Sequence, residues 1–227
     1  MDWELLLKDV QNRIEPYAKP NYKNYKAEEI YYWYFVAKWI AEDSIKNNVN
    51  DVLDVGCGHG TLSVFAKELY GSLVTSVDVT NYMSQSMVNS FGLKYRLLDI
   101  ETEMSQLFEE NAYDRIILTE VMEHLYFNPV PTLFNLREML KDDGKLFLST
   151  PDSVEWGFLN GFYNHVGEMP NPGDIQKPEF STIDQHIYQY NIGEVNRIIA
   201  EAGFKINKFE YCKIGKRARH LNYELTI

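Results

Sequence analysis

Short hydrophobic runs alternate along the chain with stretches in which hydrophobic residues recur at every third or fourth position. The runs predict buried strands, at 51–55, 73–77, 93–98, 113–119 and 145–150. The stretches between them predict helices, at 61–70, 82–90, 102–110 and 131–141. Strands that alternate with helices favour a parallel sheet whose right-handed crossover helices cover both faces.

Both ends of the chain add elements to this pattern. Helical spacing predicts an amphipathic helix over 27–46, and a second helix from Asn191 to Gly203, where Asn191 and Glu194 form a capping box. Two last strands, joined by a basic loop, predict an antiparallel hairpin, at 204–211 and 221–227. We therefore predict an α/β fold: a doubly wound, Rossmann-like, mostly parallel seven-stranded sheet with helices on both faces.

A chain of 227 residues is the size of one domain, so these elements are expected to share one core. We divide it into an N-terminal helical cap (1–48), a core (49–150), an insertion (151–190) and a C-terminal helix with hairpin (191–227). The insertion mixes glycines, prolines and aromatic residues without a period. A loop of this length is usually functional, so we expect it and residues 17–35 to form a lid over a pocket.

Composition narrows the possible partners and the compartment. The net charge of −11 disfavours long nucleic acid, because an acidic surface repels a phosphate backbone. The two cysteines, Cys57 and Cys212, fit neither a disulfide framework nor a zinc site, which suits a reducing cytoplasm. Residues 1–14 do not resemble a signal peptide, and we expect no membrane insertion because no hydrophobic run approaches about 20 residues.

A glycine-rich turn follows the first predicted strand. Asp54, Gly56, Gly58 and Gly60 alternate there, and glycines are needed where the backbone approaches a ligand closely. A dinucleotide fingerprint would place its third glycine at Thr61. An acid before the first glycine suits a ligand that carries an ammonium group better than one that carries a pyrophosphate.

This turn resembles the first motif of the class I S-adenosylmethionine-dependent methyltransferases. The resemblance continues through segments that each fall at the end of a later predicted strand or over it: Val77-Asp78, Leu98-Asp99-Ile100, Asp114 to Glu123, and Leu140 to Pro151. It implies S-adenosylmethionine as the cofactor. It also implies that Asp78 accepts hydrogen bonds from the ribose hydroxyls, that Asp99 and Ile100 flank adenine, and that Glu120 lies under the methionine moiety. The implied cofactor-binding set is Asp54, Gly56, Cys57, Gly58, Asp78, Val79, Asp99, Ile100 and Glu120.

The residues after the fourth strand are candidates for the chemistry itself. A hydroxyl acceptor must lose a proton, and Glu123 and His124 are the candidate catalytic residues. The string Glu120-Val121-Met122-Glu123-His124 also resembles small-RNA 3′-terminal 2′-O-methyltransferases and ubiquinone-pathway O-methyltransferases. That resemblance implies a magnesium site formed by Glu120, Glu123, His124 and the later His186. In metal-free relatives the same string packs beneath the cofactor.

Several functions fit these residues. The main prediction is methyl transfer to a hydroxyl of a small molecule, such as a sugar or another natural product. The alternatives are an RNA 3′-terminal 2′-O-methyltransferase, a small-molecule N-methyltransferase, and a module that binds the cofactor without turnover. The acidic charge and the single short basic cluster, within 213–219, weigh against RNA.

Overall fold

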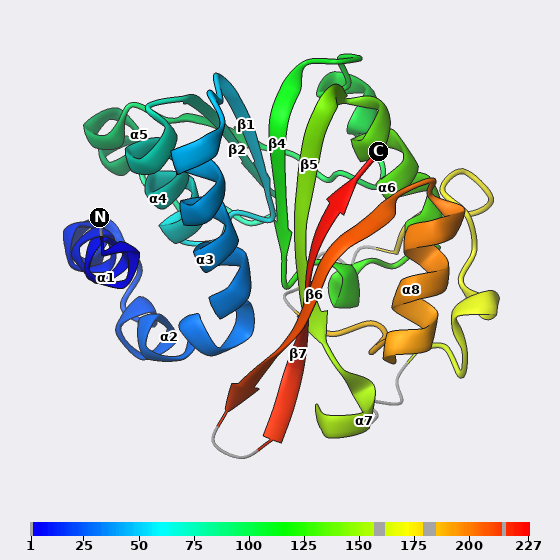
Figure 1. Cartoon of the computed structure of the whole chain (residues 1–227). Coiled ribbons are helices and arrows are strands. Elements are labelled where there is room, and N and C mark those ends of the chain that lie inside the picture. The colour runs from blue at the N-terminus through cyan, green and yellow to red at the C-terminus, as the bar shows by residue number, and fades with distance from the viewer. Residues whose placement is uncertain (1, 157–161, 179–184, 215–216) are drawn as a thin grey trace.

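The computed structural model describes residues 2–156, 162–178, 185–214 and 217–227. One seven-stranded sheet runs through the molecule, in the order β3-β2-β1-β4-β5-β7-β6 (Figure 1). The strands are β1 (Asp51–Val55), β2 (Leu73–Asp78), β3 (Lys94–Leu97), β4 (Tyr113–Thr119), β5 (Leu140–Pro151), β6 (Lys205–Ile214) and β7 (Arg217–Thr226). Strands β1 to β5 pair in parallel, and β7 is antiparallel to both β5 and β6. The predicted fold class is confirmed.

Helices cover both faces of the sheet (Figure 1). The α-helices are α1 (Trp3–Ile14), α2 (Tyr22–Glu28), α3 (Ile30–Lys46), α4 (Thr61–Tyr70), α5 (Gln85–Phe91), α6 (Pro129–Glu138), α7 (Ser153–Trp156) and α8 (Ile192–Glu201). Short 3₁₀ turns are η1 (Glu15–Tyr17), η2 (Met104–Gln106), η3 (Met122–His124) and η4 (Val166–Glu168). One hydrophobic cluster joins α1, α3, α4 and α5 to the sheet, and a second joins α6 and α8 to the opposite face.

The helix predicted over 102–110 is wrong. Only the 3₁₀ turn η2 forms there. Met104 and Leu107 are buried in the core, and their spacing of three is satisfied by that single turn. The preceding segment is held by side chains instead: Asp99 accepts a hydrogen bond from the backbone N–H of Glu101, and Glu101 accepts bonds from Tyr126 and Phe127.

The basic loop predicted within 213–219 is also shorter than expected. The ladder between β6 and β7 continues to the Ile214–Arg217 pair, so both strands extend into it. The lysines and arginines of this segment are not typical of a buried strand. The end of a hairpin that projects past the sheet, however, need not be hydrophobic. The capping box of α8, by contrast, forms as predicted between Asn191 and Glu194.

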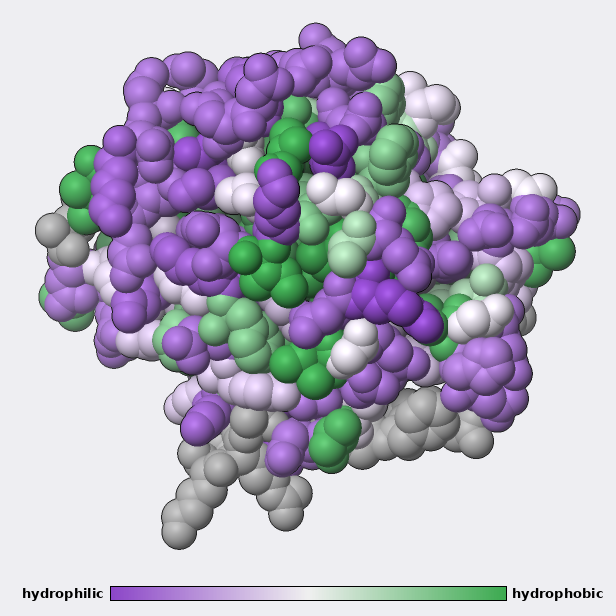
Figure 2. All heavy atoms as spheres, turned by 45° about the vertical axis from the view of Figure 1, so that its right-hand side comes forward, coloured by the Kyte–Doolittle hydropathy of each residue, from purple (hydrophilic) through white to green (hydrophobic). Residues whose placement is uncertain are grey.

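Figure 2 shows hydrophilic side chains over most of one face, with hydrophobic residues gathered near its centre. Within the described parts of the chain, no helix combines the length and the hydrophobic character that crossing a bilayer requires.

Candidate functional site

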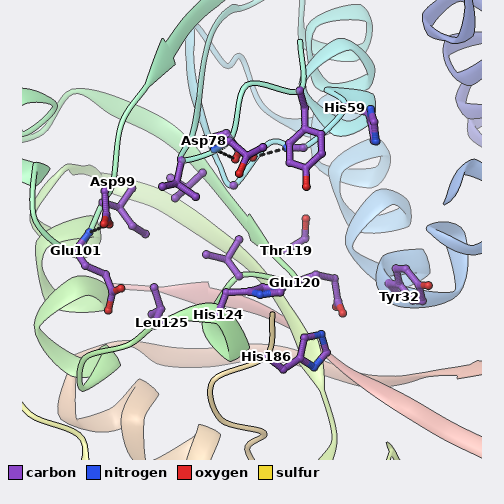
Figure 3. Close-up of a pocket in the computed structure, with 18 of the residues that line it drawn as sticks. Tyr32, His59, Asp78, Asp99, Glu101, Thr119, Glu120, His124, Leu125 and His186 are labelled. Carbon is purple, nitrogen blue, oxygen red and sulfur yellow. Dashed lines mark hydrogen bonds between the residues drawn. The ribbon is translucent and has the colours of Figure 1, made fainter. Parts of the chain in front are cut away.

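A cavity of about 390 Å³ opens at the carboxyl ends of β1, β2 and β4. The strand order runs outward from β1 to β2 on one side and from β1 to β4 on the other, so this is the point at which the connections change direction. Open parallel sheets bind their ligands at such a point. Asp99 and Glu101 lie toward one end of the cavity, and Tyr32 and Glu120 lie toward the other (Figure 3).

The glycine turn after β1 brings backbone to the cavity wall. Gly56 and Gly58 line the cavity and have φ angles of 67° and 51°, a region that other residues rarely adopt. A Cβ atom on Gly56 would lie 2.2 Å from Cγ2 of Val121. Space as well as backbone conformation therefore requires glycine at position 56.

Asp78, the last residue of β2, lies beside this turn and lines the cavity. Its Oδ2 accepts a hydrogen bond from the N–H of Gly58 at 2.8 Å, and its Oδ1 accepts one from Thr80 at 2.7 Å (Figure 3). Val79 beside it is half exposed and lines the cavity. Two backbone donors thus fix the carboxylate at the end of β2, where the sequence predicted a ribose partner.

Two predicted cofactor residues lie behind the turn and do not line the cavity. Asp54 is buried, and its Oδ2 accepts a hydrogen bond from the Ser63 hydroxyl at 2.5 Å. Burial raises the pKa of Asp54 to about 7. Cys57 is buried too, and burial raises the pKa of its thiol. The geometry therefore gives both a place beneath the turn, and a direct role for either stays a prediction.

Asp99 and Ile100 line the cavity as predicted, together with two residues that the sequence did not suggest. Nζ of Lys177 lies 2.7 Å from Asp99 and 2.6 Å from Glu101. Burial raises the pKa of Glu101, and the charge of Lys177 partly offsets this. Lys177 belongs to the segment without a sequence period, so no pattern could have paired it with these acids.

Glu120 directly follows β4 and has an unusual backbone, with φ at 54°. Such strain in a non-glycine residue is often found at functional sites. Its Oε1 accepts a hydrogen bond from the Ser149 hydroxyl at 2.7 Å, and its Oε2 lies 2.8 Å from Nδ1 of His220. His220 is buried on β7 and lines the cavity. The sequence analysis did not identify it.

Three of the four predicted metal ligands come together. One ligand atom from each of Glu123, His124 and His186 lies within 4.8 Å of the others. The carboxylate of Glu120 is outside this group and bonds Ser149 and His220 instead. Two imidazoles and one carboxylate suit zinc or another transition metal better than magnesium, which prefers oxygen ligands. The predicted magnesium site therefore finds no support in this donor set.

The two predicted catalytic residues differ in position. His124 lines the cavity, and its Nδ1 lies 2.8 Å from the carbonyl oxygen of Gln185. Glu123 is buried, and its carboxylate accepts a hydrogen bond from Thr150 at 3.0 Å. Only His124 of this pair reaches the cavity wall, and the catalytic role of either stays a prediction.

Both segments predicted as a lid contribute to the cavity wall. Asn21, Tyr25 and Tyr32 come from the N-terminal segment, and Lys177 and His186 come from the insertion. Of the other aromatic residues in these two segments, Tyr22 and Trp33 are buried, Tyr31 is exposed, and neither Phe162 nor Tyr163 lines the cavity. The side chains of Trp156 and Phe158 lie outside the described residues. Opening and closing of the lid remain predictions.

The chain is similar to known proteins in both sequence and structure. Residues 28–208 match the family model of a methyltransferase domain. A ubiquinone biosynthesis O-methyltransferase of Coxiella burnetii is 35% identical over 134 residues, which cover 56% of this chain and 53% of the relative. A sphingolipid C9-methyltransferase of Candida albicans is 29% identical over 49% of this chain and 25% of the relative. The aligned region thus spans about half of these curated relatives or less.

Solved structures share the fold at low sequence identity. The trans-methyltransferase CalH in complex with S-adenosylhomocysteine (SAH) superposes with a TM-score of 0.61 at 21% identity, covering 83% of this chain and 54% of that one. The [4+2]-cyclase SpnF superposes equally well, with a TM-score of 0.61 at 12% identity over 86% of this chain and 84% of that one. Proteins with this fold therefore have more than one activity, so the function has to be inferred from the residues of the site.

Proposed function

The chain belongs to the S-adenosylmethionine-dependent methyltransferases, and from this premise we propose that it transfers the methyl group of S-adenosylmethionine to a hydroxyl group of a small molecule. The observation that carries the choice of a hydroxyl is the hydrogen-bonded pair of Glu120 and His220 on the cavity wall.

The cofactor would occupy the end of the cavity near the glycine turn. Asp78 would accept hydrogen bonds from the ribose hydroxyls, and Asp99 and Ile100 would flank the adenine. Gly56 and Gly58 would let the backbone approach the methionine moiety. When bound, the cofactor supplies a positively charged sulfonium with an electrophilic methyl carbon, and the acids lining the cavity favour that charge.

The opposite end would hold the acceptor. A carboxylate that accepts a hydrogen bond from Nδ1–H of histidine fixes the tautomer in which Nε2 carries the lone pair. In His220 this carboxylate is Glu120, which Ser149 also holds, so the proposal places Glu120 at the acceptor instead of under the methionine moiety, the position that the resemblance implied. Nε2 would take the proton of the acceptor hydroxyl as its oxygen attacks the methyl carbon. Glu120 would then stabilise the imidazolium, as the acid of a catalytic triad does.

The two alternative acceptors, an RNA terminus and an amine, fit the charge and the side chains of the cavity less well. Among the described residues that line the cavity, Lys177 is the single lysine or arginine, and it is already paired with Asp99 and Glu101. An RNA terminus would bring phosphates that this wall does not attract. Methylation of an amine has less need of a general base, so it would not explain the Glu120–His220 pair.

The neighbouring group of Glu123, His124 and His186 has the donor atoms to hold a transition metal. A transition metal held there could polarise an acceptor oxygen, in which case His124 and His186 would supply the nitrogen ligands. The proposed proton transfer to His220 does not depend on it, since Glu120 is bonded elsewhere.

The test is product mass spectrometry with a ¹³C-methyl donor and pools of phenols, sugars, amines and short RNAs. We expect labelled methyl ethers from one of the hydroxyl pools. His220→Gln should lower kcat on that acceptor by about 10²–10⁴-fold, the usual contribution of a general base. His124→Gln tests the alternative base in the same assay.

His165→Gln is the matched control, because His165 is exposed and does not line the cavity. It should leave kcat unchanged. Label found only on amines or RNA, or full turnover by the His220→Gln protein, would refute the proposal.

A further inference from the structure

Helix α3 is bent at the point where it passes the cavity. Trp33 has φ −136° and ψ 32°, outside the helical region. In a regular helix the carbonyl of Tyr32 accepts a hydrogen bond from the N–H of Val36. Here the side chain of Asn222 bridges these two groups: its Nδ2 donates to Tyr32 at 2.8 Å, and its Oδ1 accepts from Val36 at 3.3 Å. A side chain inserted in this way is a recognised cause of helix kinks.

Asn222 comes from β7 and is fully buried. It lies two residues after His220, so both side chains point to the same face of the sheet. The kink that Asn222 supports places the Tyr32 ring beside the His220 ring, with 4.7 Å between the centroids. The Tyr32 hydroxyl donates to Glu28 at 2.9 Å, which holds the other end of the ring. Tyr32 is therefore fixed at both its backbone and its hydroxyl.

The charges around this end of the cavity restrict what can bind. The carboxylate of Glu120 lies next to His220. The cation Lys177 is bound to the acids near the predicted adenine position, at the other end. The cavity wall at this end instead offers aromatic faces, from Tyr25 and Tyr32.

We propose that Tyr32, held by Asn222, is the specificity-determining residue of the acceptor subsite, and that this subsite takes an uncharged acceptor with a flat face beside its hydroxyl. A flat ring can pack against the tyrosine face. A phosphate or carboxylate would meet Glu120, and the described cavity wall offers no lysine or arginine except the paired Lys177 to compensate its charge. This inference rests on the proposed function for the position of the acceptor.

Three matched probes test the charge preference: 2-naphthol, 2-naphthoate and 2-naphthyl phosphate, each titrated by calorimetry into the SAH complex. We expect 2-naphthol to bind at least about tenfold more tightly than either anion, since an unpaired buried charge is costly. Equal or tighter binding of an anion would overturn the inference.

The role of Tyr32 is tested with the neighbouring tyrosine as control. Tyr32→Leu should weaken 2-naphthol binding by about tenfold, the upper range of one aromatic contact, and Tyr32→Phe should largely retain it. Tyr31→Leu, at an exposed position outside the cavity wall, should have no effect. Equal effects of Tyr31→Leu and Tyr32→Leu would refute the assignment.

Asn222 acts through Tyr32, so its variants should change acceptor binding without changing SAH affinity. Asn222→Asp keeps the acceptor for Val36 but loses the donor to Tyr32, and we expect it to raise the acceptor KM while kcat changes little. An unchanged KM would contradict the positioning role, and the Tyr32 variants decide the case if the Asn222 variant does not fold. Naphthol selectivity without methyl transfer to any hydroxyl would refute the proposed function and leave this subsite intact.

Discussion

Two of the regions that contain buried acids differ in the groups that surround the carboxylates. Where α3 meets the sheet, Asp43 is buried and ion-paired: Nε of Arg115 lies 2.7 Å from it and Nζ of Lys145 lies 2.8 Å from it. Burial alone would raise the pKa of Asp43, but the hydrogen bonds and charges of Arg115 and Lys145 outweigh it and lower the pKa. These pairs join α3 to β4 and β5.

Two buried acids near the glycine turn, Glu29 and Asp54, are held by uncharged side chains instead. Glu29 accepts hydrogen bonds from Gln11 at 2.7 Å and Thr61 at 3.0 Å, and Asp54 accepts one from Ser63. Within the described chain, neither forms an ion pair with a lysine or arginine. Burial raises the pKa of each to about 7. The ion pairs of Asp43 join the helical layer to the sheet, whereas Glu29 and Asp54 are buried without a paired cation among the described residues and do not line the cavity.

The largest effect is expected from breaking the paired region. Asp43→Asn leaves Arg115 buried without its countercharge, so the free energy of unfolding should fall by about 3–5 kcal/mol. Urea denaturation measures this. The exposed pair of Asp9 and Arg13 is the control, and Asp9→Asn should cost less than about 1 kcal/mol. Similar small losses at both sites would remove the distinction between the two kinds of acid.

The acids without a cation should show the opposite pH dependence. The pKa of Glu29 is about 7 in the folded protein and 4.5 ordinarily, so between these values the folded state holds a proton that the unfolded chain has lost. Stability therefore falls as pH rises from about 4.5 to about 7 and then levels off. For Asp43, whose pKa is lowered, stability is instead lost as pH falls.

Glu29→Gln should remove the part of the pH dependence of stability that Glu29 causes. Above pH 7 it should raise the free energy of unfolding by up to about 3 kcal/mol. Unfolding free energies of both proteins between pH 5 and 8 measure this difference. The raised pKa of Asp54 adds a decrease of stability with pH that is the same in both proteins. A variant that is equally stable at pH 5 and less stable than the wild type at pH 8 would contradict the account.

The smallest effect concerns metal. Because the proposed proton transfer uses Glu120 and His220 and not the group of Glu123, His124 and His186, we expect EDTA to leave kcat unchanged in the assay with the ¹³C-methyl donor. A loss of turnover that zinc or magnesium restores would instead assign the group of Glu123, His124 and His186 a role in the reaction.

The sequence predicted the half of the site that is encoded locally. The glycine turn directly follows β1, and Asp78 is the last residue of β2. The order of strands and turns along the sequence was therefore enough to place them. His220 was not predictable in this way. It meets Glu120 across a separation of 100 residues, and only the pairing of β7 with β5 brings them together. Lys177 and Asn222 were missed for the same reason, because their partners are tertiary.

The affinity of SAH for the Asp78→Ala protein tests the central claim most directly, measured by calorimetry beside the free energy of unfolding. Asp78 lies at the end of β2, where its carboxylate would bind the ribose. Affinity should fall by about 10–100-fold, the value of charge-assisted hydrogen bonds, while unfolding changes far less than in Asp43→Asn, which should keep normal SAH affinity. Unchanged affinity in Asp78→Ala, or weakened SAH binding in a folded Asp43→Asn protein, would contradict the division between acids that hold the fold and acids that bind the cofactor.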